Sequence, residues 1–406
     1  MKASTAVRLG SSALCACLGL LAALALSSCA RAHEIGQFCE PPGTKREGPQ
    51  GEASVLHPLD APPEKLEDGW PVSTLAAEGF DPKPIGEMLR AVEAGEYTKL
   101  DSILIARNGK LVLEAYFNGY DRETKHDTRS AFKSFTSALV GIAIDKGLIE
   151  GIEQPMSAFF PDYWPDLRND PEKKSRITLA HLLTMTPGFE AEENFGVGPF
   201  QEDEMNRSDD WYRFTLDLPM AWKPGTQYAY NTPTTVLLGG VIAHAAGEPV
   251  PAFAKTHLFA PLGITDYCWT LTPKGRAMTG GNFFIRPRDM LKFGQLFLDG
   301  GVWHGQRLVS ESWVRESTRR HLEAAPPGKT GTEPGRLGYG YQWWTYRARN
   351  PRFDQYFASG NGGQKIFVFP GFDMVAVFTS SNYNKPIGHT QITRMFNRFI
   401  APAMVD

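Results

Sequence analysis

The stretch Ser130-Ala-Phe-Lys133-Ser-Phe-Thr-Ser-Ala-Leu-Val-Gly-Ile-Ala143 decides the fold of this 406-residue chain. Its apolar side chains predict a helix from about Ser130 to Lys146, which Gly147 ends. The helix is too apolar to lie on a surface, so we expect it to be buried. Ser130 and Lys133 stand three residues apart at its start. This spacing places both side chains on one face, within reach of a hydrogen bond.

This pair has the chemistry of a nucleophile and its base. A serine hydroxyl is a weak nucleophile and needs a base to take its proton. Lysine can do so only when it is neutral, and burial among Phe132, Phe135 and Leu139 would lower the pKa of Lys133. The helix N-terminus adds partial positive charge, which disfavours an ammonium there and favours an oxyanion. The alternative is a serine that caps the helix, followed by a solvated lysine.

Strand patterns occur towards both ends of the chain. Two runs, Ser102–Arg107 and Lys110–Phe117, flank Asn108-Gly109, a pair typical of a tight hairpin turn. Further patterns predict helices over Pro84–Ala94, Pro287–Leu298 and about Gln391–Ile400, and late strands over Tyr339–Tyr346, Gln355–Ser359, Lys365–Phe369 and Met374–Thr379. Residues of about 150–275 form a helix-rich insertion between the two groups of strands. We therefore expect an α/β (α+β) fold, with one antiparallel sheet built from both chain ends and flanked by helices.

The first 28 residues predict a signal peptide. Lys2 and Arg8 precede an uncharged apolar run, and Leu26-Ser-Ser-Cys29 resembles the bacterial lipoprotein signal, in which the cysteine is lipidated. The alternatives are an ordinary secretory signal and an uncleaved anchor helix. Residues 29–70 are rich in proline and glycine and predict a flexible tether. Residues 71–406 would then form one domain, exported and lipid-anchored at the cell envelope, facing the periplasm or the exterior.

Cysteine, histidine and charge narrow the choice of partners. Outside the signal and Cys29, only Cys39 and Cys268 remain; they could form a disulfide in an oxidising compartment or stay as two thiols. Two cysteines and widely spaced single histidines do not support a metal site, and we expect no cofactor. The net charge is −3, and −5 without Lys2 and Arg8, with no basic tract. Nucleic acid is therefore a poor candidate, and a small molecule or peptide is the expected partner. The oligomeric state stays open.

The quoted helix resembles the first active-site motif of the serine β-lactamase and penicillin-binding-protein superfamily, in its class C and esterase-like branch. Four more segments resemble that branch in order along the chain: Ile177–Gly188, Pro224–Gly239, Arg288–Leu298 and Ser310–Val314. The resemblance runs from about Pro82 to the C-terminus. It implies that Ser130 is the acylated nucleophile, Lys133 its base, and Tyr230 a phenol that relays a proton to the leaving group.

Two departures from the family pattern concern substrate binding. The usual Tyr-x-Asn is here Tyr230-Asn231-Thr232, with the asparagine one place early. The third motif is Ala358–Gln364, which includes Gly360, Asn361 and Gly362 but lacks the cation that receives a β-lactam carboxylate. Its glycines permit close backbone approach. One N–H of this stretch, with that of Ser130, would form an oxyanion hole. Asn231, Gly360, Asn361 and Gly362 are therefore the candidate substrate-binding and oxyanion residues.

Both departures resemble the 6-aminohexanoate-dimer hydrolase group. The missing cation argues against efficient β-lactam turnover, since a charge-assisted contact contributes ~1.5–3 kcal/mol. We expect a serine hydrolase that cleaves amide or ester bonds. The alternatives are a cell-wall D,D-peptidase or β-lactamase, and a lipid-anchored binding protein without catalysis.

An acidic segment follows the first family motifs. Glu190–Asn194 mimics the Glu-x-x-x-Asn of class A enzymes, which we interpret as chance. It belongs to the longer segment Glu190–Asp217, which could border the pocket and favour substrates with a free amine, or could be a solvated loop.

Overall fold

The structure is a computed structural model and describes residues 38–39, 54–193, 200–324, 333 and 335–404. The predicted signal peptide and Cys29 lie outside these residues. Nine strands form one antiparallel sheet in the order β1-β3-β2-β14-β13-β12-β11-β10-β9. They are β1 Val55–Leu56, β2 Leu100–Arg107, β3 Lys110–Tyr116, β9 Leu322–Glu323, β10 Leu337–Tyr339, β11 Trp344–Tyr346, β12 Gln355–Gly360, β13 Gln364–Phe369 and β14 Met374–Ser380.

The sheet joins the two ends of the chain, as the sequence predicts. The early strand β2 pairs with the late strand β14 over most of its length. Side chains of β14 alternate between two hydrophobic cores: Val375 and Val377 face one, and Ala376 and Phe378 face the other. Both faces are therefore covered by helices, and the α/β (α+β) fold class predicted from the sequence is confirmed.

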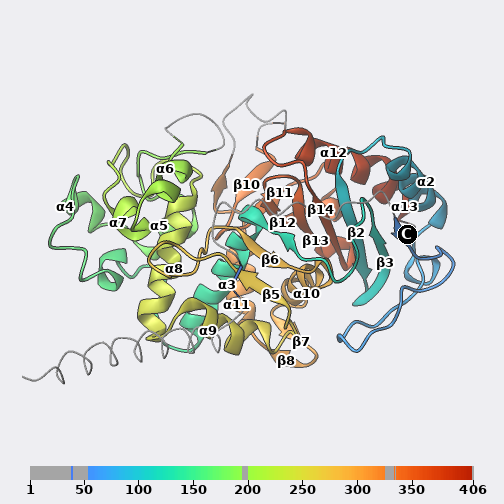
Figure 1. Ribbon diagram of the computed structural model, residues 1–406, viewed down its shortest axis with the longest axis horizontal. Helices are drawn as coiled ribbons and strands as arrows, with labels where there is room; N and C mark the ends of the chain where they lie inside the picture. The colour runs from blue at the N-terminus through green and yellow to red at the C-terminus, as the bar shows by residue number, and fades with distance from the viewer. Residues whose placement is uncertain (1–37, 40–53, 194–199, 325–332, 334, 405–406) are drawn as a thin grey trace, which may run out of the picture.

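Three helices cover one face of the sheet, and three others lie on the opposite side. The first group is α2 Pro82–Glu93, α12 Ile387–Met395 and α13 Ala401–Ala403; the second is α3 Phe132–Asp145, α8 Thr232–Ala246 and α10 Pro287–Leu298. The remaining helices are α4 Pro171–Lys174, α5 Leu179–Leu183, α6 Glu202–Arg207, α7 Trp211–Leu216, α9 Val250–Ala254 and α11 Glu311–Thr318. Figure 1 shows α4–α8 gathered at one end of the molecule, with α3 between them and the sheet.

Two small sheets complete the structure. One has the order β4-β6-β5, with β4 His126–Asp127, β5 Tyr267–Trp269 and β6 Phe283–Ile285. The other pairs β7 Val302–Trp303 with β8 Gln306–Arg307. The strand β4 ends two residues before the turn that carries Ser130, so this small sheet helps to hold the start of α3.

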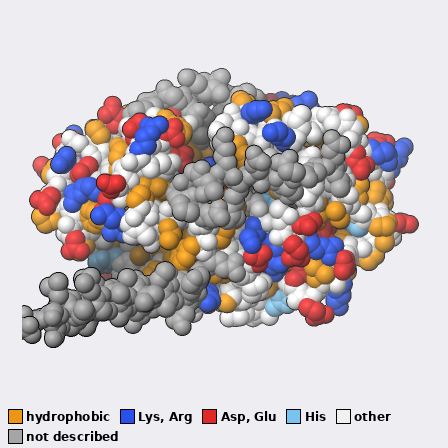
Figure 2. Space-filling model, viewed as in Figure 1, with side chains coloured by type: hydrophobic (Ala, Val, Ile, Leu, Met, Phe, Trp, Pro, Cys, Tyr) orange, Lys and Arg blue, Asp and Glu red, His pale blue; other side chains and the backbone are white. Residues whose placement is uncertain are grey.

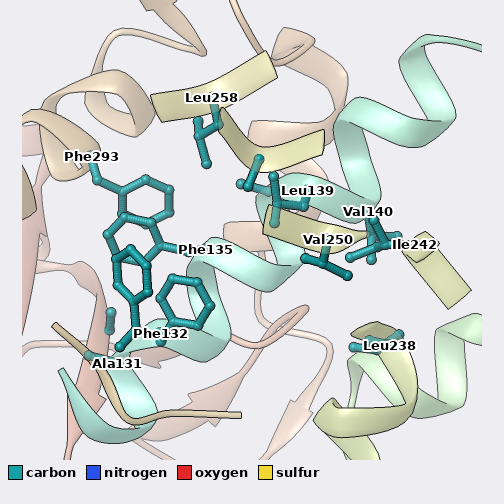
Figure 3. Packing of buried hydrophobic residues seen from close by; sticks show 14 of the residues in the cluster. Ala131, Phe132, Phe135, Leu139, Val140, Leu238, Ile242, Val250, Leu258 and Phe293 are labelled. Atoms are coloured by element: carbon teal, nitrogen blue, oxygen red, sulfur yellow. The ribbon is translucent and has the colours of Figure 1, made fainter. Parts of the chain in front are cut away.

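The expected burial of α3 is observed. The Phe135 ring stacks on Phe293 of α10 with centroids 3.6 Å apart, and both lie in the cluster that Figure 3 shows. Further along α3, a β-carbon at Gly141 would lie 2.3 Å from the Trp313 ring. The glycine therefore allows α11 to pack closely on α3. These contacts fix the helix, and with it the position of Ser130 and Lys133.

Two expectations need correction. The run Tyr339–Tyr346, expected as one strand, is the hairpin β10–β11, because a turn that includes Gln342 at φ 61° reverses the chain. The tether expected over residues 29–70 is wrong for its last part, residues 54–70. There β1 pairs with β3, and Arg288 bonds Asp68 at 2.8 Å. Trp70 is buried in the core, which supplies the apolar contacts that hold this segment.

Cys39 and Cys268 form a disulfide, so the open choice between pairing and two thiols is settled for pairing. Phe38 forms a bridge with Trp269 beside it, which attaches the N-terminal segment to the small sheet.

On the face seen in Figure 2, outside the grey atoms, basic and acidic side chains are interspersed.

Candidate active site

Ser130 lies in a 3₁₀ turn, Arg129–Ala131, that leads directly into α3. Arg129 has φ 47°, a left-handed conformation that an arginine adopts only when its surroundings hold it there. Asp127 Oδ1 accepts from the Arg129 backbone N–H at 2.9 Å, and Asp127 Oδ2 forms an ion pair with Arg129 Nε at 2.9 Å. Ala131, and not Ser130, occupies the N-cap of α3, with no side-chain cap bond. The capping alternative for Ser130 therefore does not hold, and its hydroxyl bonds Lys133 instead.

Lys133 is the centre of the site. Its side chain is 1% exposed, and its Nζ lies 3.0 Å from Ser130 Oγ, 3.0 Å from Thr232 Oγ1 and 2.7 Å from the carbonyl oxygen of Gly280. Burial lowers the pKa of Lys133, and the negative charges of Glu193 and Glu202 partly oppose this shift. All three partners accept from Lys133 Nζ in the structure. In the neutral amine, two N–H groups donate to Thr232 and Gly280, which leaves the lone pair for the proton of the Ser130 hydroxyl.

Tyr230 joins the pair from the segment before α8. It is 5% exposed, hydrogen-bonded to Ser130, and its ring lies 5.1 Å from Lys133 Nζ. Burial raises the pKa of Tyr230, and the bond with Ser130 opposes this only in part. Its phenol therefore keeps its proton near neutral pH. This differs from the lowered pKa that a proton relay beside a cation suggests, and it suits a group that donates a proton to a leaving group.

The two residues after Tyr230, Asn231 and Thr232, make different contacts. Asn231 is fully buried and caps α8: its Oδ1 accepts from the Thr234 N–H at 2.9 Å, and its Nδ2 donates to the Ala229 carbonyl at 2.7 Å. Thr232 is the residue whose side chain contacts Lys133. The structure therefore brings Ser130, Lys133, Tyr230 and Thr232 together, while Asn231 is engaged with its own helix.

Glu193 also contacts the site, although it is not among the candidate site residues predicted from the sequence. Its carboxylate accepts from the Thr232 N–H at 2.6 Å and from the Thr232 hydroxyl at 2.8 Å. Its backbone N–H donates to the Tyr230 carbonyl at 2.8 Å. Burial raises the pKa of Glu193 to about 8. The sequence shows a Glu-x-x-x-Asn pattern over Glu190–Asn194. Only the folded chain shows that Glu193, one of its three glutamates, reaches the site.

The third motif lies at the end of β12, against the turn that carries Ser130. A β-carbon at Gly360 would lie 2.2 Å from the Thr128 carbonyl oxygen, so only glycine permits this approach. The Asn361 side chain exchanges hydrogen bonds with Asn384. Gly362 has φ 92° and bridges to Asn382. Gly360 thus allows the end of β12 to lie against the turn that carries Ser130.

Lys365 follows the motif and bonds one of its residues, Ser359. Lys365 Nζ bonds Ser359 Oγ at 2.6 Å and lies 5.0 Å from the Phe357 ring. Burial lowers the pKa of Lys365 to about 7. Its neighbours Phe357 and Phe367 belong to the core beneath α12, on the other side of the sheet from the one that Ile366 faces.

Within the described residues, no group of three or more His, Cys, Asp or Glu side chains could hold a metal ion. No single helix of this part of the chain is long and apolar enough to cross a membrane. The bent pair of helices Thr232–Ala246 and Val250–Phe259 has, taken together, the length and apolar composition of a span.

Known proteins resemble this chain in sequence over most of its length. The family model described as Beta-lactamase matches residues 99–398. The 6-aminohexanoate-dimer hydrolase of Paenarthrobacter ureafaciens is 27% identical, over 70% of this chain and 74% of that protein. Esterase EstB of Burkholderia gladioli is 28% identical over 40% of this chain, which spans less than half (45%) of the esterase.

A solved structure gives the same fold. A candidate 6-aminohexanoate-dimer hydrolase from Bacillus anthracis superposes with a TM-score of 0.65 at 20% identity, covering 91% of this chain and 89% of that one. The family match spans well over half of the chain. The chain therefore belongs to the β-lactamase family, in the esterase-like branch of the serine β-lactamase and penicillin-binding-protein superfamily, and is a serine hydrolase.

Proposed function

We propose that this hydrolase cleaves amide or ester bonds of small molecules or peptides through an acyl-enzyme on Ser130. The proton of the Ser130 hydroxyl passes to the Lys133 amine while the serine oxygen forms a bond to the carbonyl carbon. The leaving group then departs with a proton from the Tyr230 phenol, which regains one from Lys133. Water releases the acyl group in the second half of the reaction. The N–H groups of Ser130 and of the Gly360–Gly362 stretch are the proposed oxyanion donors.

One observation carries this proposal: the buried Lys133 amine lies 3.0 Å from Ser130 Oγ. A lysine with a lowered pKa beside a hydroxyl is an activated base, whereas a solvated ammonium would not take the proton. The same observation weighs against a binding protein without catalysis, because such a protein gains nothing from burying a lysine against a serine.

The geometry favours linear amides and esters over β-lactams. In the chain, the stretch Ala358–Gln364 has no basic residue, and the adjacent Lys365 side chain is bonded to Ser359 within the core. A β-lactam carboxylate would then lack its charged partner from this strand. The relatives named as a 6-aminohexanoate-dimer hydrolase and as an esterase support the same choice.

We also propose that the protein is exported and lipid-anchored through Cys29, facing the periplasm or the exterior. The disulfide between Cys39 and Cys268 supports an oxidising compartment. Labelled palmitate should be incorporated by cells that express the wild type and not by cells that express Cys29→Ser. Incorporation by both would contradict the anchor.

The catalytic proposal is tested by labelling the full-length protein with a fluorophosphonate, which reacts with activated serines. We expect labelling of the wild type and of Ser137→Ala, two turns along the same helix, but none of Ser130→Ala. The unlabelled wild-type enzyme is then assayed with short-chain esters, linear amides and nitrocefin. Its kcat/KM values rank these three substrate classes. A folded wild type that takes no label, or a Ser130→Ala variant that still does, would overturn the mechanism.

A further inference from the structure

Glu193 is joined to the nucleophile by a continuous series of hydrogen bonds. Ser130 Oγ bonds Lys133 Nζ at 3.0 Å, Lys133 Nζ bonds Thr232 Oγ1 at 3.0 Å, and Thr232 Oγ1 donates to Glu193 Oε2 at 2.8 Å. Thr232 is thus a bridge between a buried base and a buried carboxylate. We infer that Glu193 is a positioning residue that, through the Thr232 hydroxyl, stabilises the ammonium formed when Lys133 takes the proton of Ser130.

The carboxylate is held in place from two sides. Its oxygens accept from the N–H and the hydroxyl of Thr232, the first residue of α8, where the helix dipole favours a negative charge. Its own backbone N–H donates to the Tyr230 carbonyl at 2.8 Å. None of these three hydrogen bonds involves a substrate. Glu193 is therefore fixed relative to Tyr230 and Thr232 before the reaction begins.

The charge changes during acylation show what such a carboxylate would do. When the Ser130 O–H bond breaks, the proton joins the lone pair of Lys133 Nζ, and the serine oxygen bonds the acyl carbon. The new ammonium keeps its N–H bonds to Thr232 and Gly280. A buried ammonium without a counter-ion is costly, and a carboxylate one hydroxyl away offsets part of that cost. Lys133 becomes a stronger base without direct contact with an acid.

Other charged or titratable groups around this pair are Tyr230 and Glu202. Glu202, at the start of α6, is a like charge that raises the pKa of Glu193 and also favours the Lys133 ammonium. Burial acts on both partners in the direction of neutrality: it lowers the pKa of Lys133 and raises that of Glu193 to about 8. The charge on either partner favours the charge on the other, because Glu193 raises the pKa of Lys133 and Lys133 lowers that of Glu193.

This inference rests on the proposed acyl-enzyme mechanism and is tested by the pH dependence of kcat/KM. A 4-nitrophenyl ester is the probe, because 4-nitrophenolate leaves without a proton and the measurement then reports the base alone. Activity rises with pH as Lys133 loses its proton. Removal of a carboxylate that favours the ammonium lowers the pKa of Lys133. In Glu193→Gln the acid limb should move to lower pH by about one unit, and the plateau should fall roughly three- to tenfold because the base is weaker.

The controls separate an electrostatic role from a structural one. Glu190→Gln removes an equal charge from an exposed position three residues away and should leave the limb in place. Thr232→Val removes the bridging hydroxyl and should shift the limb in the same direction as Glu193→Gln, while Thr232→Ser should restore the wild-type profile. If Glu193→Gln does not fold, the two Thr232 variants decide by the same criterion.

A plateau that falls without a shift of the acid limb would overturn the inference, and so would a shift to higher pH. Neither result affects the labelling of Ser130 by the fluorophosphonate. Conversely, an unlabelled wild type would contradict the proposed function itself, so the two failures can be told apart.

Discussion

Thr232 stands two residues after Tyr230, and its hydroxyl lies 3.0 Å from the Nζ atom of Lys133. The family pattern places an asparagine side chain at this spacing, and here a threonine occupies it, while Asn231 caps the helix. The exchange does not leave Lys133 without a partner, because a hydroxyl accepts the same N–H. It adds a donor directed at Glu193, so one side chain connects the base to a carboxylate.

Lys133→Met should abolish the base while keeping the length and apolar character of the side chain. We expect kcat/KM for a 4-nitrophenyl ester to fall by about 10²–10⁴-fold. Lys146→Met, at the exposed C-terminal end of the same helix, should stay within twofold of the wild type. Thermal unfolding of both variants checks that the fold is kept. A folded Lys133→Met variant with wild-type activity would show that another group takes the Ser130 proton.

Tyr230→Phe should separate substrates by their leaving groups. An alkyl amide needs a proton on its departing nitrogen, so its kcat should fall by about 10²-fold or more. A 4-nitrophenyl ester needs none, so its kcat should fall much less. Tyr228→Phe, two residues earlier in the same segment, serves as the control. It should leave kcat unchanged for both the amide and the ester. Equal losses on both substrates would assign Tyr230 a role in position or stability instead of proton donation.

Asn231→Ala should affect stability more than substrate binding. Loss of this N-cap leaves the Thr234 N–H and the Ala229 carbonyl without their partner, and should reduce the free energy of unfolding by about 1–2 kcal/mol. Asn231→Ser keeps a capping oxygen and should lose less. Denaturant unfolding measures both. If KM instead rises many-fold at unchanged stability, the substrate-binding role predicted from the family pattern is right.

The sequence predicted best where one local signal fixes the structure. Pro287 begins α10 and Leu298 ends it, as expected, and Asn108 and Gly109 both have positive φ in the hairpin turn. Strands of two or three residues, such as β1 and β5, are too short to show a period of two and were not predicted. Ser130, Lys133 and Tyr230 could be predicted because each lies in a motif. Glu193 could not, because its contact with Thr232 depends on how a loop returns to α8.

Gly360→Ala should show that the approach of β12 to the nucleophile requires a glycine. The added carbon would lie 2.2 Å from the Thr128 carbonyl oxygen, so either β12 or the turn before Ser130 must move. We expect kcat to fall at least tenfold, since small displacements of positioned groups are costly. Gly151→Ala, where the added carbon has open space, should behave as the wild type. Unchanged kcat in Gly360→Ala would contradict close contact between the motif and the Ser130 turn.

Lys365→Met should change how stability depends on pH. The pKa of Lys365 is about 7 in the folded protein and 10.5 is its ordinary value, so between these pH values the unfolded chain holds a proton that the folded chain lacks. Stability contributed by this group therefore rises as pH increases through that window, by up to about 1.4 kcal/mol per pH unit. Denaturant unfolding between pH 7 and 10 should show a shallower rise in Lys365→Met than in the wild type, and no such change in Lys146→Met. Parallel curves for Lys365→Met and the wild type would mean that Lys365 keeps its proton inside the core, held by Ser359 Oγ at 2.6 Å and by the faces of the Phe357 and Phe367 rings.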